Sequence, residues 1–239
     1  MSGAWIQTFG GGKFDILDPK VQDVDPVMLA HSLAKLCRFT GHSKQFYSVA
    51  SHSLLVADLV AGLGREDLRP HALLHDAHEA VIGDWSTPLK RALVLTFPGA
   101  DDVLTCIEAP IKAVIHEAFG LDWPYADADR ALIKQADWLA LAAEKRDLLH
   151  PGPDWTAWKL PEAPVLKAIA LEWPLAVHEF WRAMIREVAA GRMRMPNWPK
   201  VANDNPAPTA VGPGAAAMAV ERAQEKEPAP LVGGRREEN

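Results

Sequence analysis

Apolar side chains recur every three or four positions along most of the chain, which is the period of one face of an α-helix. The first such segment begins after Pro26, and Asp25 stands in the position of a helix-capping residue. Beyond the N-terminal segment no strand-like alternation appears. We therefore predict an all-α fold with helices over residues 27–37, 48–63, about 69–82, 101–119, 127–149 and 165–191, the last one interrupted at Pro174.

The two ends of the chain depart from this helical pattern. Two short β-favouring runs flank Gly10, Gly11 and Gly12, which predicts a small N-terminal β-hairpin. From about Ala202 the composition changes to Ala, Pro, Gly and charged residues, with few large apolar side chains to bury. We expect one domain over residues 1–200 and a disordered tail over 201–239. Loops are predicted around Pro88 and in the proline-rich segment 150–164.

Charge and composition narrow the classes of function. The 239 residues carry a formal net charge of −6, which argues against a general nucleic-acid binder or a protein that binds anionic membranes. No segment has the apolar length of a membrane span or of a secretory signal. Cys37 and Cys106 lie in apolar helical patterns, so we expect two reduced core thiols rather than a disulfide. A soluble cytoplasmic protein is the expectation.

Several titratable residues fall within the helical segments at positions that otherwise read as core. His75, Asp76 and Glu79 would project to one side of a helix within a single turn. His52 and Asp137 lie in the apolar stripes of two other helices. A single buried histidine or aspartate is more often a hydrogen-bonded core residue than a ligand. Together, His52, His75, Asp76 and Asp137 form a mixed nitrogen and oxygen set that suits a divalent cation with room for water and substrate. No His-Glu-x-x-His motif or cysteine pair supports another zinc site.

These residues resemble the signature of the HD-domain metal-dependent phosphohydrolases, in which His, His-Asp and a distant Asp stand on successive helices. The likeness is closer to the YfbR-like 5′-deoxynucleotidase group. There an Arg and an aromatic residue precede the first His, and the pattern HD-x-x-E…GD-x-x-T-P-x-K follows. The resemblance covers residues 30–149, and Phe39 departs from it by replacing Trp. The matching positions are Arg38, Phe39, His75, Asp76, Glu79, Gly83, Asp84, Thr87, Pro88 and Lys90.

The resemblance implies roles for residues around the metal ligands. Glu79 would orient or deprotonate a water, with Asp84 as a second catalytic candidate that is equally well a turn residue or an acceptor for a sugar hydroxyl. Substrate binding would fall to Arg38, Phe39, Thr87 and Lys90, the two cations facing phosphate and Phe39 stacking on a base. His71 and His78 match no position of the pattern and are expected near the ligands or in solvent, and His42 has no assigned role.

The expected function is hydrolysis of nucleoside 5′-phosphates by an HD-domain enzyme that holds one of Co, Mn, Zn, Fe, Ni or Mg. Phosphate release from deoxynucleoside monophosphates is favoured because the matched motif contains few cations. Two alternatives stay open: a deoxynucleoside triphosphate triphosphohydrolase with the same metal site, and a metal-bound nucleotide sensor without activity. Lys44, Arg91 and Lys134 are candidate cations for a triphosphate that the sequence does not place. The expected partner is the nucleotide, and a homodimer is left open.

Overall fold

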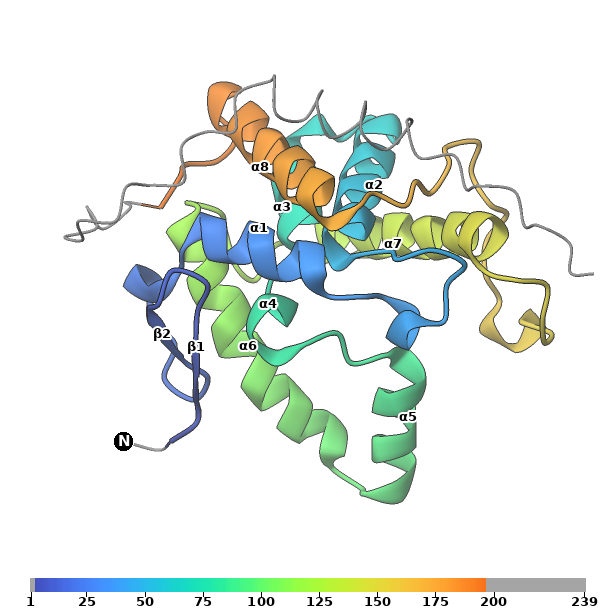
Figure 1. The fold of residues 1–239 in the computed structure, drawn as a ribbon, viewed down its shortest axis with the longest axis horizontal. Coiled ribbons are helices and arrows are strands. Elements are labelled where there is room, and N and C mark those ends of the chain that lie inside the picture. The colour runs from blue at the N-terminus through green and yellow to red at the C-terminus, as the bar shows by residue number, and fades with distance from the viewer. Residues whose placement is uncertain (1–2, 197–239) are drawn as a thin grey trace, which may run out of the picture. The chain divides into compact units, whose positions relative to one another are not determined.

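The computed structural model describes residues 3–196 and confirms the predicted all-α class and the N-terminal hairpin (Figure 1). In the hairpin, Ile6 pairs with Phe14 between antiparallel strands. The predicted tail over 201–239, and the last residues of the domain predicted over 1–200, lie outside the described residues. The elements are β1 (Trp5–Gln7), β2 (Lys13–Asp15), α1 (Pro26–Lys35), α2 (Val49–Gly62), α3 (Arg69–Leu74), α4 (Glu79–Ile82), α5 (Thr87–Thr96), α6 (Ala100–Ala118), α7 (Asp127–Leu148) and α8 (Trp173–Ala189).

Helix α2 is the centre of the core and contacts α1, α3, α7 and α8 (Figure 1). Ten of its fourteen residues are buried, so the helix has almost no face left for solvent. Such a helix is normally apolar all round. A polar side chain on α2, such as His52, therefore lies inside the core and needs a partner there.

The start of α1 follows the predicted capping signal. The Asp25 side chain accepts a hydrogen bond from the backbone N–H of Val27 at 2.8 Å, and Pro26 opens α1. Pro174 likewise stands in the first turn of α8 rather than inside a helix. The prediction of a helix over 165–191 interrupted at Pro174 was therefore wrong for the residues before Trp173. Proline at the first positions of a helix loses no backbone hydrogen bond, which is why it begins this one.

Two helical predictions around residues 69–96 were also wrong. The single helix predicted over about 69–82 is divided: α3 ends at Leu74 and α4 begins at Glu79. Between them the backbone bonds run to the third preceding residue, as from Ala77 to Leu74 and from Glu79 to Asp76, both at 3.0 Å. This tighter winding is that of a 3₁₀ turn. The loop predicted around Pro88 is largely α5, with Pro88 in its first turn.

A buried arginine fixes α3 in place. Arg69 donates from Nε to Glu187 on α8 at 3.1 Å and from Nη2 to Asp58 on α2 at 2.9 Å. Arg69 and Glu187 are both nearly inaccessible to solvent, so each neutralises the other's charge inside the core. The ion pairs tie α3, and the His75-Asp76 turn that follows it, to α2 and α8.

The prediction of core thiols was wrong, because Cys37 and Cys106 are both exposed, although both are free as expected. Cys37 lies beyond the end of α1, and Cys106 lies on a turn of α6 that few other side chains cover. Apolar spacing alone does not show where along its length a helix leaves the core. Within residues 3–196, no helix combines the length and the apolar character that a membrane crossing requires.

Candidate metal centre

Two histidine rings face each other between α2 and the turn after α3. The Nδ1 atom of His52 lies 2.6 Å from Glu144 Oε1, and Nδ1 of His75 lies 2.7 Å from the carbonyl oxygen of Ala72. If each Nδ1–H donates to these oxygens, both Nε2 atoms carry a free lone pair. Neither buried Nε2 has a hydrogen-bond partner among the described residues. Buried histidines with one nitrogen oriented by an acceptor and the other free are typical of metal ligands.

Two carboxylates complete the cluster. Asp137 on α7 places Oδ1 3.2 Å from His52 Nε2, and Asp76 places Oδ2 3.1 Å from His75 Nε2 and 3.7 Å from His52 Nε2. Ligand atoms of His52, His75 and Asp137 all lie within 4.8 Å of one another, so this buried group could hold a metal ion. Four residues predicted as ligands from three separate helical segments are thus brought together, in a donor set that fits a divalent cation.

Electrostatics shows that the cluster needs positive charge. Burial raises the pKa of Asp76, but His75 and His52 hold it well below its usual range. Burial and Arg38 lower the pKa of His52, yet Glu144 and Asp137 outweigh them and raise it to about 9. A proton on His52 is one way to balance these carboxylates, and a bound cation is another. Proton and metal therefore compete for the same nitrogen.

One residue that the sequence analysis missed lies behind the ligands. Glu144 on α7 is completely buried and accepts hydrogen bonds from Tyr47 Oη at 3.0 Å and from Arg38 Nη2 at 3.3 Å, in addition to its contact with His52. Asp137 and Glu144 are seven residues apart, so they share one face of α7. A glutamate at that spacing, within an alanine-rich apolar stripe, is the signal that could have indicated it.

Arg38 lies at the cluster, as the resemblance implied. Its Nη1 is 3.8 Å from Asp76 Oδ2, and its guanidinium carbon is 5.7 Å from the centre of the Phe39 ring. The backbone here is strained, because Phe39 and Thr40 adopt φ angles of 55° and 52°. A bulky residue rarely takes a positive φ, and such strain clusters at functional sites.

The remaining candidate residues surround Glu79. Its Oε2 is buried without a hydrogen-bond partner among the described residues, and burial together with Asp76 and Asp84 raises its pKa to about 10. Burial also raises the pKa of Asp84. Burial lowers the pKa of Lys90, but its hydrogen bond to Glu108, together with the charges of Glu79 and Asp76, outweighs this and raises it. Thr87 is exposed at the start of α5.

Glu108 on α6 is a second residue that the sequence analysis missed. It accepts hydrogen bonds from Lys90 Nζ at 2.8 Å and from Lys112 Nζ at 2.7 Å, and His78 Nε2 lies 3.4 Å away. These cationic and histidine partners keep the pKa of Glu108 below its usual range. Glu108 therefore holds the Lys90 ammonium on the side of the cluster where Glu79 lies. Lys90, His78 and Glu108 also line a cavity of about 290 Å³ whose other walls are mainly apolar.

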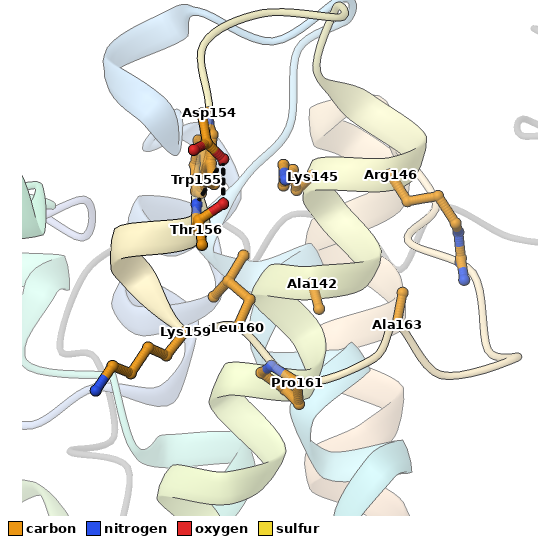
Figure 2. A pocket seen from close by; sticks show the side chains of 10 residues that line it. All are labelled: Ala142, Lys145, Arg146, Asp154, Trp155, Thr156, Lys159, Leu160, Pro161 and Ala163. Atoms are coloured by element: carbon orange, nitrogen blue, oxygen red, sulfur yellow. Dashed lines mark hydrogen bonds between the residues drawn. The ribbon is translucent and has the colours of Figure 1, made fainter.

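A larger cavity of about 500 Å³ lies against the outer face of α7 (Figure 2). Lys145 places its Nζ 5.4 Å from the centre of the Trp155 ring, and Asp154 accepts hydrogen bonds from Thr156. The described residues that line this cavity include no histidine and only one carboxylate, that of Asp154. This cavity lacks the donors that hydrolytic metal chemistry needs, so the candidate site is the cluster on the opposite side of α7.

Comparison with known protein families finds no match for the chain. The uncharacterized protein YfdR of Escherichia coli strain K12 is 36% identical over 167 residues, which cover 70% of this chain and 80% of YfdR. An uncharacterized protein of Rhodobacter capsulatus is 38% identical over 154 residues, which cover 62% of this chain and 74% of that protein. The chain belongs to the protein family that includes E. coli YfdR and this Rhodobacter protein.

Proposed function

We propose that the protein is a divalent-metal-dependent phosphohydrolase of the HD-domain type that acts on nucleoside 5′-phosphates and releases phosphate from deoxynucleoside monophosphates. The observation that carries the proposal is the meeting of His52, His75, Asp76 and Asp137, in which the Nε2 atoms of the two histidines face carboxylate oxygens at 3.2 Å and 3.1 Å. Arg38 beside this cluster supplies a group that suits phosphate. The resemblance of the sequence to YfbR-like 5′-deoxynucleotidases supplies the substrate class.

In this proposal His52, His75, Asp76 and Asp137 hold the cation. A divalent ion supplies Lewis-acid chemistry, which lowers the pKa of water and withdraws charge from a phosphoryl oxygen. Glu79 orients the attacking water and takes its proton. The charges of Asp76 and Asp84 contribute to the raised pKa of Glu79, and a cation beside Asp76 would offset these charges and lower that pKa toward neutrality. Arg38 binds phosphate oxygens through its guanidinium, whose two terminal nitrogens now face Asp76 and Glu144.

The charges near the cluster favour a monophosphate. Of the candidate cations, Lys134 lies 2.7 Å from Asp137 Oδ2, whereas Lys44 bonds the carbonyl oxygen of Asp147. Every lysine or arginine that the structure places at the cluster, Lys90 included, already faces a carboxylate. A triphosphate carries about two more negative charges than a monophosphate. Among the described residues no free cation is placed at the cluster to balance them.

The test uses the full-length protein, stripped with a chelator and reloaded separately with each of the six candidate metals. Deoxynucleoside mono- and triphosphates are supplied, and the products are separated by chromatography. We expect inorganic phosphate from the monophosphate, with activity lost on stripping and restored by metal. Faster release of inorganic triphosphate from the triphosphate would instead establish the triphosphohydrolase. Metal binding without any product would establish the nucleotide sensor.

A further inference from the structure

Helix α5 is unusual because all ten of its residues are described and none is buried. Its main packing partner is α6, and the two helices form a hairpin through the turn at 97–99. Figure 1 shows α5 and the first half of α6 lying apart from the helices around α2. A ten-residue helix is marginally stable by itself in water. Its exposed position therefore requires an explanation.

The exposed side chains of this hairpin are largely apolar. Leu95 is 77% exposed, Phe97 61% and Val103 60%, and Val94 and Leu89 are exposed as well. On α5, Val94 and Leu95 follow Arg91 by three and four residues, so these side chains share one face. Exposed apolar side chains gathered on one hairpin mark an interaction site more often than a scattered exposed residue does. We name the set Arg91, Val94, Leu95, Phe97, Asp102 and Val103 the hairpin face.

The charges of the hairpin identify the kind of partner. Arg91 lies midway along α5, whereas Asp101 and Asp102 lie at the tip, in the first turn of α6. None of these three forms an ion pair with a residue in the described range 3–196. By contrast, Lys90, Lys112 and Glu108 on the inner side of the same hairpin are all paired. The outer side thus carries a free cation and free carboxylates separated along its length.

We propose that the hairpin face binds the hairpin face of a second copy of this chain across a two-fold axis. Antiparallel packing of two hairpins brings the tip of each against the middle of the other. Asp102 of one copy then meets Arg91 of its partner, and the same pair forms twice, as an isologous interface requires. Leu95, Phe97 and Val103 are buried between these pairs. One surface thereby satisfies both its apolar side chains and its unpaired charges.

The charge pattern disfavours an anionic membrane as the occupant. Membrane-binding surfaces gather several lysines and arginines around their apolar residues. Here the apolar tip carries Asp101 and Asp102, which anionic lipid headgroups would repel. The proposal concerns assembly alone and does not depend on the proposed enzymatic function, since its readout is molecular mass.

The experiment measures the mass of the full-length protein by sedimentation over a wide concentration range. We expect a reversible dimer. Leu95→Lys should raise the dimer dissociation constant by about 100-fold or more, because two buried leucines are replaced by like charges. Val165→Lys is the matched control, since Val165 is 98% exposed and lies outside the hairpin. It should leave the dimer unchanged.

A charge exchange tests the pairing itself. Arg91→Asp and Asp102→Arg should each weaken the dimer by about tenfold, and the double variant should restore it. A wild-type chain that stays monomeric at all concentrations would overturn the proposal, as would a dimer insensitive to Leu95→Lys. Failure of the double variant to restore the dimer would overturn the two-fold pairing. Sedimentation with anionic vesicles of a monomeric chain, lost in Leu95→Lys, would identify a membrane surface instead.

Discussion

The candidate metal cluster, formed by His52, His75, Asp76 and Asp137, and the α5–α6 hairpin depart from the usual distribution of side chains in opposite ways. At the cluster, His52 and Glu144 are completely buried. The buried Nε2 atoms of His52 and His75 accept or donate no hydrogen bond among the described residues. On the hairpin, Leu95 and Phe97 are exposed and Arg91 is unpaired. Polar groups inside a protein call for a ligand, whereas apolar groups outside call for a partner. The first region is therefore a candidate for binding a small ligand, and the second is a candidate for binding a macromolecule.

The backbone separates the two regions in the same way. The hairpin turns through Gly99, whose φ of 90° is accessible to glycine without strain. Near the cluster, the left-handed positions include Phe39 and Thr40. At the hairpin, the residue with a positive φ is a glycine, which adopts this conformation without strain. Beside Arg38, the residues with a positive φ have side chains that disfavour it. Such conflicts persist where function demands them.

The largest effect is expected from removing a metal ligand. His75→Ala and Asp137→Ala should each reduce both bound metal and phosphate release to background, because each deletes a donor atom of the cluster. Metal analysis of the purified variants, beside a turnover assay, makes the measurement. His178→Ala, which removes an exposed histidine of α8, should change neither. Full metal occupancy in both ligand variants would show that the cation lies elsewhere.

The next effect concerns stability. Glu144→Ala should lower the free energy of unfolding of the metal-free protein by about 3–5 kcal/mol, because it leaves Arg38 and His52 buried without their carboxylate. Asp101→Ala on the hairpin should lower it by less than about 1 kcal/mol, since Asp101 is exposed and unpaired. Denaturant titration at neutral pH compares the two. Equal losses would mean that the buried network carries no special weight.

A catalytic effect of similar size is expected at Glu79. Glu79→Gln should reduce kcat by about 100-fold while metal stays bound, because the amide cannot accept the proton of the attacking water. Glu117→Gln on α6, where the side chain is exposed, is the control and should keep full activity. If kcat of Glu79→Gln stayed unchanged, another group would have to activate the water.

The buried half of α6 provides a pH test. His116 is completely buried, and desolvation lowers its pKa to about 4. Between pH 4 and 6.5 the unfolded chain therefore binds more protons than the folded one, and stability falls as the pH falls through this range. The loss attributable to His116 should be about 2 kcal/mol at pH 5.

Replacement of the histidine measures that contribution. In His116→Gln the difference in unfolding free energy between pH 7.5 and pH 5 should shrink by this amount. Urea titrations at the two pH values decide it. An unchanged difference would mean that other groups, such as His71, whose pKa burial also lowers, account for the whole pH dependence.

The sequence predicted that His52, His75, Asp76 and Asp137 meet, with Arg38 beside them, because each belongs to a local pattern of spacing or motif. It missed Glu144 because the partners of Glu144 lie far away along the chain, 92 residues in the case of His52 and 106 in the case of Arg38. Apolar period also did not distinguish the 3₁₀ turn at His75–His78 from a continuous helix, since both place the same residues inward. No residue type around Phe39 in the sequence indicated that Phe39 itself would adopt a positive φ.

The smallest effect isolates that strained backbone beside Arg38. Phe39→Ala and Phe39→Gly both remove the aromatic ring, so they differ only in what the backbone tolerates. Because Phe39 has a φ of 55°, the glycine variant should be the more stable of the two by about 1 kcal/mol. At an ordinary helical position the order reverses: Ala131→Gly in α7 should lose about 1 kcal/mol. Thermal or urea unfolding of the three variants gives the comparison.

A Phe39→Ala variant as stable as Phe39→Gly would show that this segment relaxes freely, and the contrast between a strained cluster and an unstrained hairpin would fail. If the expected order holds, any loss of substrate discrimination shared by both Phe39 variants belongs to the missing ring, because strain is present in one and relieved in the other.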